Sequence, residues 1–400
     1  MVQTLRLYYL FRGLSSAFLF KVFLVFFYLE RGLAFTQIGI LQAVFAATVI
    51  IFEIPTGIYS DRYGRRSAMA WGALLMSLAS LGYYFAWSFA VFVSLEFLLA
   101  LGLTLTSGAD SAFLYDMLKK SGKVEKYPEM EGKASMAKHF GMAISSAVGG
   151  LIATKSLALL FPLTSIIIFL SFLVSLLLDR KKFLRGLNSR TRETPLQFSR
   201  DSKIFRGHGS IWWVISYSSL IFLLIRVTDT LLHPVLKANG YSYMVIGFIA
   251  SGGAIFAALS AFYFSRFLST NRSILVVWII PAILILSMIV FVYGNGVILA
   301  FILLANLGIQ GIYSPLTKSV LNEQISRSEV RATVLSLESS VKRLIIALVM
   351  PLAGYIIDQS SISGGLLFIS SIAGLLLFVL MFSNPVGMKS KNVAETRLDQ

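Results

Sequence analysis

The chain has 400 residues, of which 56% are hydrophobic and only 14% are charged, and its mean hydropathy is +0.78. A soluble chain carries about 25% charged residues, whereas the apolar runs here approach about twenty residues, enough to cross a hydrocarbon core. This composition excludes a soluble domain, the absence of cysteine excludes disulfides and thiolate chemistry, and we interpret the net charge of +16 as membrane-flanking loop charge rather than nucleic-acid binding.

The apolar runs predict an all-α polytopic membrane protein with twelve transmembrane helices in two six-helix pseudo-repeat bundles. The expected parts are an N-terminal bundle over 1–182, a cytoplasmic linker over 183–210, and a C-terminal bundle with a short cytoplasmic tail over 211–400. The spans are expected at about residues 5–29, 36–59, 67–87, 90–118, 131–154, 158–179, 211–235, 241–265, 273–293, 296–321, 330–356 and 362–383.

The distribution of lysine and arginine predicts the orientation of these spans. The loops expected on one side hold only Arg31, Lys155 and Lys237, whereas basic residues cluster in the loops on the other side and in the linker. Because such clusters stay in the cytoplasm, we expect both termini there. The chain is thus expected to be a multi-pass protein of the cell membrane.

The two halves of the sequence repeat. Gly32–Gly39 matches Gly240–Gly247, and Gly150 matches Gly354 at nearly the same spacing. This indicates an internal duplication. In transporters built from such repeats, the substrate site lies between the repeats, near the bilayer midplane.

The loop after the second span, Gly57–Arg66, reads Gly-Ile-Tyr-Ser-Asp-Arg-Tyr-Gly-Arg-Arg. With six plus six spans and a basic central linker, this loop resembles the major facilitator superfamily. The resemblance covers essentially the whole chain. It implies a secondary transporter in which two bundles rock to expose one site alternately to either side of the membrane.

The same resemblance implies that this loop closes the cytoplasmic gate in the outward-facing state. Asp61 is expected to approach the start of the eleventh span, at Glu329–Thr333, and Asp116 is expected to pair with Arg65 or Arg62. The expected gating residues are Gly57, Asp61, Arg62, Gly64, Arg65, Arg66 and Asp116.

Within the superfamily, the fifth span is most similar to that of drug:proton antiporters. Those proteins carry a Gly-Pro-x-x-Gly-Gly ending there, and the stretch from Gly141 to Gly150 keeps the glycines without the proline. The resemblance implies a multidrug efflux antiporter. We therefore expect proton-coupled efflux of small amphipathic or drug-like compounds.

Ionisable residues inside spans usually face the protein interior, because a charge at the bilayer centre costs about 2.5–3.5 kcal/mol. Arg12, Glu53, Asp110, Lys138 and Glu338 each lie about 10 Å from the inner end of a span, at a rise of 1.5 Å per residue. One interpretation is that they pair, Arg12 with Glu53 and Lys138 with Asp110. The other is that Glu53 or Asp110 titrates during transport, and we favour Glu53.

A second layer of charges lies nearer the midplane and the outer side, and its cations exceed its acids. Its members are Lys21, Arg226, Asp229, His233, Lys342 and Arg343. The excess favours an anionic substrate, so the alternative function is a symporter or exchanger of a small organic anion. The alternative interpretation, which needs no substrate, is that some of these cations snorkel or pair with backbone carbonyls.

These layers give the candidate site residues. Proton-coupling candidates are Glu53, Asp110 and Asp229, and substrate-cavity candidates are Arg12, Lys21, Lys138, Arg226, His233, Glu338 and Arg343. The scattered histidines predict no metal site. Without a Walker loop, zinc-protease motif or nucleophile elbow, we expect no enzyme and no cofactor. The expected partners are a small-molecule substrate, protons and the lipid bilayer, with the protein a monomer that binds no nucleic acid.

Overall fold

The computed structural model describes residues 2–178, 209–267, 273–293, 297–324 and 331–383. Over these residues the regular secondary structure is helical, which confirms the all-α class. Eight of the described helices are long and apolar enough to cross a membrane. Most of the expected linker and the C-terminal tail lie outside the described residues, and the total of twelve spans stays a prediction.

The described helices follow the expected spans closely at most boundaries. They are α1 (Val2–Leu14), α2 (Leu24–Glu30), α3 (Phe35–Tyr63), α4 (Arg65–Phe85), α5 (Phe89–Thr106), α6 (Ala109–Lys120), the 3-10 helix η1 (Val124–Lys126), α7 (Tyr127–Ala153), α8 (Leu160–Leu177), α9 (Gly209–Ala238), α10 (Tyr243–Phe267), α11 (Ser273–Tyr293), α12 (Val297–Gln324), α13 (Arg331–Gln359) and α14 (Ile362–Phe382).

The first expected span, 5–29, is interrupted, so the prediction of one continuous helix there is wrong. The chain leaves the helix after Leu14 and re-enters it at Leu24. Between them, the Leu19 amide donates to Thr164 Oγ1 at 3.1 Å, and a Cβ added to Gly149 would lie 2.4 Å from the Leu19 carbonyl oxygen. Neighbouring helices therefore cover this irregular backbone, as a membrane interior requires.

The fourth expected span, 90–118, is interrupted as well. Helix α5 ends at Thr106 and α6 begins at Ala109. Gly108 between them has φ of +82°, a conformation that residues with a Cβ avoid. The break sets Asp110 in the first turn of α6.

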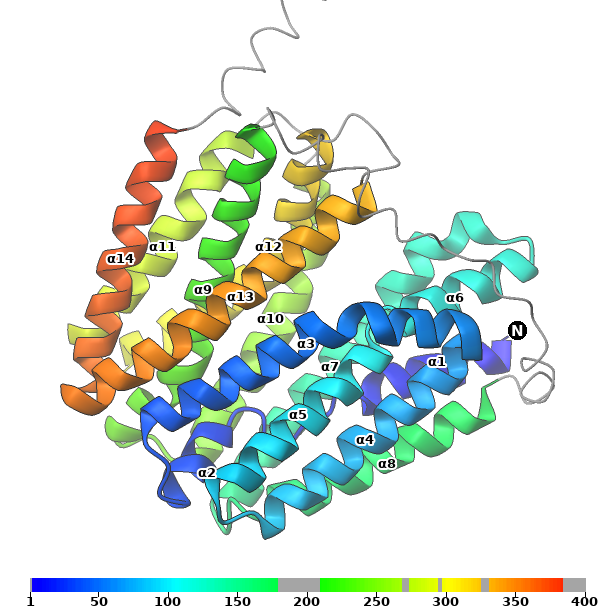
Figure 1. Ribbon diagram of the computed structural model, residues 1–400, viewed down its shortest axis with the longest axis horizontal. Coiled ribbons are helices and arrows are strands. Elements are labelled where there is room, and N and C mark those ends of the chain that lie inside the picture. Colours follow the sequence, from blue (N-terminus) through cyan, green and yellow to red (C-terminus); the bar gives the residue numbers. More distant parts are fainter. Residues whose placement is uncertain (1, 179–208, 268–272, 294–296, 325–330, 384–400) are drawn as a thin grey trace, which may run out of the picture.

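Figure 1 shows two groups of helices, α1–α8 and α9–α14, that meet along two crossings. Helix α3 packs on α13, and α7 packs on α10. Within the first group α4 packs on α5 and α8, and within the second α9 contacts α11, α12, α13 and α14. The close contacts between groups thus run through α3, α7, α10 and α13.

The two crossings depend on glycines that let backbones touch. A Cβ on Gly39 would lie 2.3 Å from the Met350 carbonyl oxygen, and one on Gly354 would lie 2.1 Å from that of Phe35. In the other crossing, a Cβ on Gly150 would lie 2.9 Å from the Gly247 Cα. Such small residues permit tight helix packing where lipid provides no hydrophobic drive.

We name each end of the molecule after an aspartate that lies there. The Asp358 end holds the starts of α3 and α10 and the ends of α7 and α13, and there the two groups meet. The Asp61 end holds the turn between α3 and α4 and the start of α13. In Figure 1 the groups converge at lower left and diverge toward the Asp61 end.

Large apolar side chains cover the outside of the molecule. Phe382 on α14 is 79% exposed, Leu286 on α11 is 59% exposed, and Ile166 on α8 is 58% exposed. These helices correspond to the twelfth, ninth and sixth expected spans. An exterior of this kind suits acyl chains rather than water.

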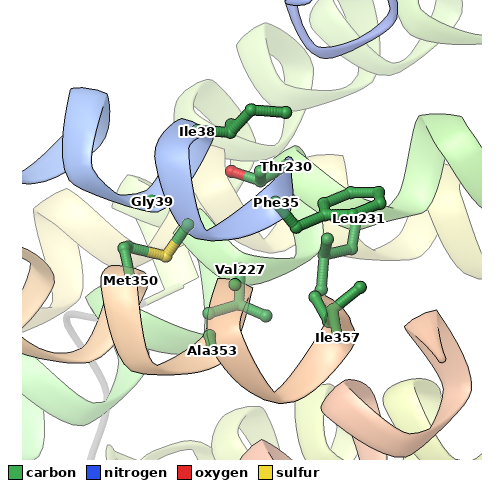
Figure 2. Close-up of a pocket in the computed structure, with 10 residues that line it drawn as sticks. Phe35, Ile38, Gly39, Val227, Thr230, Leu231, Met350, Ala353 and Ile357 are labelled. Atoms are coloured by element: carbon green, nitrogen blue, oxygen red, sulfur yellow. The ribbon is translucent and has the colours of Figure 1, made fainter. Parts of the chain in front are cut away.

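A small pocket lies between α3, α9 and α13 near the Asp358 end (Figure 2). Its cavity volume of about 10 Å³ is roughly the space that one water needs. Thr230 supplies its only side-chain oxygen, and the other lining residues are apolar or glycine. We regard it as a packing gap rather than a solute site, since the charged residues lie elsewhere.

Candidate functional site

The middle of α9 carries the charged residues that face both groups of helices. Arg226 Nη2 donates to Gln42 Oε1 of α3 at 2.8 Å. Asp229 Oδ1 accepts from Gln310 Nε2 of α12 at 2.7 Å. Two glutamines from different helices therefore hold two charges that lie one turn apart on α9.

Lys21 joins this cluster from the irregular segment between α1 and α2. It is exposed, although it belongs to the interior of the first expected span. It lies within electrostatic range of both Asp229 and Arg226. His233, one turn further along α9, donates its Nδ1 hydrogen to the Asp229 carbonyl at 3.0 Å, and its buried Nε2 has no partner among the residues that the structure describes. We call Lys21, Gln42, Arg226, Asp229, His233 and Gln310 the central cluster.

A second polar group surrounds Glu338 on α13. Lys342 Nζ lies 2.6 Å from Glu338 Oε1, which also accepts from Ser218 Oγ. Ser218 and the Tyr313 hydroxyl lie 3.0 Å apart. Oε1 of Glu338 is therefore engaged by two side chains of the second group of helices.

Arg343 follows Lys342 on α13. It lies within electrostatic range of Glu53, Arg226 and Glu338, and its buried Nε has no hydrogen-bond partner among the described residues. In the part of the chain that the structure describes, Glu53 has no ion pair and no side-chain hydrogen bond. Glu53 is thus the least engaged of the three proton-coupling candidates.

The expected pairing of Arg12 with Glu53 is wrong. Arg12 Nη1 contacts Asp110 Oδ2, and Arg12 Nη2 lies 3.7 Å from Glu131 Oε1. Glu131 also accepts from Ser111 Oγ at 3.0 Å. The break at Gly108 brings Asp110 toward α1, so Lys138 is left without the ion pair with Asp110 that the sequence suggested.

The gating loop forms a local charge cluster. Arg65 Nη2 lies 2.5 Å from Asp61 Oδ1, and Arg65 Nε lies 3.9 Å from Asp116 Oδ2. Arg66 Nε donates to the Ser175 carbonyl at 3.0 Å, and Gly64, with φ of +98°, makes the turn. The approach of Asp61 to Glu329–Thr333 falls largely outside the described residues.

Helix α3 carries the remaining loop residues. Gly57 lies within α3, where an added Cβ would meet no atom within 4 Å. The Arg62 guanidinium lies 5.5 Å from the centre of the Tyr63 ring. Neither residue contacts the central cluster, so their expected gating role stays a prediction.

Comparison with known proteins settles the family. A profile of the Major Facilitator Superfamily matches residues 7–330. The chain belongs to this superfamily. This major facilitator is therefore a membrane-embedded transporter, with a transport role rather than a catalytic one. The family confirms the coarse resemblance seen in the sequence, while the drug:proton antiporter subtype remains a prediction.

Two curated relatives match parts of this major facilitator. An uncharacterized transporter of Buchnera aphidicola subsp. Schizaphis graminum (strain Sg) is 31% identical over 103 residues, which are 24% of either chain. The uncharacterized MFS-type transporter YxaM of Bacillus subtilis (strain 168) is 26% identical over 162 residues, 40% of this chain and 39% of YxaM. The matches thus span well under half the length of these relatives.

Solved structures share the fold of this major facilitator. The nucleoside transporter NupG superposes with a TM-score of 0.77 at 14% identity, covering 96% of this chain and 98% of NupG. A point mutant of NupG gives a TM-score of 0.78 at 15% identity, covering 96% and 99%. At this identity the likeness establishes the fold alone.

Sequence reasoning missed the uncharged partners in this major facilitator. Gln42 and Gln310 bind Arg226 and Asp229, and Tyr313 binds Ser218 beside Glu338, yet none of the three stood out among the polar residues. A search for amides inside apolar runs would have found the two glutamines, since an intramembrane amide also needs a partner. Among the described residues no cluster of histidine, aspartate and glutamate could hold a metal.

Proposed function

We propose that this major facilitator carries a small organic anion by alternating access, as a symporter or exchanger. One observation carries the proposal. Lys21, Lys138, Arg226 and Arg343 have no ion pair in the part of the chain that the structure describes. Arg226 and Arg343 are half-buried, and an unpaired charge is costly there, a cost that an anionic solute with strong acceptor oxygens would offset.

The proposal assigns the transported proton to Glu53, with Asp229 and Asp110 as the other candidates. Glu53 lacks a hydrogen-bonded partner for its side chain among the described residues, whereas Asp229 and Asp110 are both engaged. Arg343 lies within its electrostatic range. An anion that binds near Arg343 would thus change the charge environment of Glu53, which is the link that coupled transport needs.

The proposed architecture comprises twelve spans, with halves at 1–182 and 211–400. The basic residues favour a cytoplasmic Asp61 end, which also places both termini in the cytoplasm of a cell-membrane protein. The contacts between the halves gather at the Asp358 end. With this orientation, they support an inward-facing conformation of a monomer.

Proton-coupled efflux of amphipathic or drug-like compounds is the second candidate. It is favoured by the antiporter-like glycines of α7, where Gly149 and Gly150 lie against Leu19 and Gly247. The hydrogen-bonded amides of the central cluster suit a polar solute better than a hydrophobic one. The fold shared with NupG adds nucleosides to the compounds that a test should include.

Transport by purified protein in liposomes tests the proposal. We expect an imposed pH gradient to drive accumulation of a carboxylate such as lactate or succinate but not of ethidium. Arg226→Gln should lower the initial rate at least tenfold. Arg31→Gln, a change in a surface arginine that packs over the Trp87 ring at 3.5 Å, should leave it unchanged.

The same assay separates the alternatives. Ethidium movement opposite to protons, with no carboxylate movement, would favour efflux and overturn the anion proposal. Uridine movement without a pH dependence would point to a neutral solute. Glu53→Gln should abolish the response to pH while leaving exchange of internal for external carboxylate intact.

A further inference from the structure

We propose that the Gln42 side chain is a placeholder for the anionic oxygen of the solute on Arg226. The inference rests on the proposed function and adds a residue that determines specificity. In the structure, the amide oxygen of Gln42 occupies one hydrogen-bonding position of the guanidinium. When an anion enters, its oxygen takes that position and the amide moves away.

The contacts around Arg226 and Asp229 carry this inference. The two residues lie three apart on α9, a spacing at which opposite charges on a helix normally attract each other. Neither pairs with the other among the described contacts. Instead, Arg226 donates to Gln42 at 2.8 Å, and Asp229 accepts from Gln310 at 2.7 Å.

Gln310 keeps the Asp229 carboxylate from pairing with Arg226, because its amide donates a hydrogen bond to that carboxylate. An Asp229 oxygen that accepts from this amide is held toward α12, and the carboxylate then leaves the Arg226 guanidinium to Gln42. The charges of Arg226 and Asp229 sum to zero, and Lys21, which lies within electrostatic range of both, gives the site its net positive charge. Without the two glutamines, Arg226 and Asp229 would neutralise each other and an anion would gain little.

The chemistry favours exchange of the amide for an anion. A guanidinium has five N–H donors in a planar fork that fits a carboxylate or a phosphate with two parallel bonds. A neutral amide oxygen uses one of these donors and forms a weaker bond than an anionic oxygen does. Gln42 can therefore hold Arg226 in the orientation that binds solute. An anion can displace the amide oxygen from the guanidinium, whereas a neutral solute cannot.

The placeholder also links binding to the conformation of the protein. Gln42 belongs to α3 and Arg226 to α9, so their hydrogen bond joins the two groups of helices. A solute that displaces Gln42 removes that bond and replaces it with its own contacts. Occupancy of the site is thereby communicated to the crossing of α3 with α13.

Two substitutions of Gln42 test the inference, because they change the occupant of Arg226 in opposite directions. Gln42→Ala vacates the position, and Gln42→Glu fills it with a carboxylate. Gln37→Glu is the matched control: it adds the same charge to the same helix, at its N-terminus, where the Gln37 side chain accepts from the Ala34 amide. Monodisperse elution in detergent verifies that each variant is folded.

The first measurement needs no solute. Phenylglyoxal modification of Arg226, followed by peptide mass spectrometry, should be at least threefold faster in Gln42→Ala than in the wild type. It should be at least threefold slower in Gln42→Glu and unchanged in Gln37→Glu. Equal rates in the wild type and both Gln42 variants would overturn the placeholder regardless of what the protein transports.

The second measurement uses lactate, succinate, glycerol 3-phosphate and uridine as ligands in calorimetry. For an anion that the wild type binds, Gln42→Glu should weaken binding at least tenfold, while Gln42→Ala should bind as tightly as the wild type or more tightly. Equal losses in both variants would overturn the placeholder alone. Binding of uridine but of no anion would overturn the proposed function, and the inference with it.

Discussion

At the scale of single residues, helix crossings decide which charges pair inside this bundle. Arg12 and Glu53 have similar expected depths, yet Arg12 contacts Asp110 and Glu131 instead. Depth along a helix axis says nothing about which face a side chain occupies. The break at Gly108, which turns α6 toward α1, could not be foreseen from charge spacing.

The Arg12–Asp110 pair gives a stability prediction. Asp110→Asn leaves the Arg12 guanidinium largely buried beside Glu131, at a contact distance of 3.7 Å. Losing one partner of a buried pair costs about 3 kcal/mol, so we expect the melting temperature to fall by several degrees in detergent. Glu129→Gln, which breaks an exposed pair with Lys133, is the control and should leave it unchanged. Equal melting temperatures for both variants would show that the Arg12 pair is not stabilising.

At the scale of elements, a carboxylate from α13 caps the start of α3. Asp358 accepts from the Phe35 amide at 2.9 Å, the Thr36 amide at 2.8 Å and the Thr36 hydroxyl at 2.6 Å. A negative charge is favoured at a helix N-terminus, where amides lack partners. Because α3 and α13 belong to different groups of helices, this cap fastens the groups together at the Asp358 end.

Removing this cap should open the Asp358 end. With Ile357→Cys as a reporter in the pocket of Figure 2, we expect Asp358→Ala to raise maleimide labelling from the outside at least threefold. Asp61→Asn, which breaks the contact with Arg65 at the opposite end, should weaken the outward-facing state and lower that labelling. If the Ile357→Cys protein is labelled no faster with Asp358→Ala than without it, the cap does not hold the Asp358 end closed.

At the scale of the whole molecule, basic residues and apolar length dictate how the chain sits in a membrane. Exposed apolar side chains on helices such as α8, α11 and α14 suit contact with lipid, whereas the polar contacts lie inside each group of helices and between the two groups. The proposed orientation places Ser121 in the cytoplasm and Asn239 outside. The two residues therefore report on opposite faces of the membrane.

Cysteine labelling checks this orientation without background, because the chain has no cysteine of its own. In intact cells, a membrane-impermeant maleimide should label Asn239→Cys and leave Ser121→Cys unlabelled. After the membrane is permeabilised, both variants should react. Labelling of Ser121→Cys in intact cells would reverse the orientation and exchange the inner and outer roles of Asp61 and Asp358.

The sequence alone determined the helical class, the approximate span boundaries and the family, since length, hydropathy and the Gly57–Arg66 motif are properties of consecutive residues. The breaks in α1–α2 and α5–α6, and the partners of Arg12, Arg226 and Asp229, came only from the tertiary structure. These features depend on which helix faces cross and how closely their backbones approach. Residues far apart in sequence set that geometry together, so no local pattern contains it.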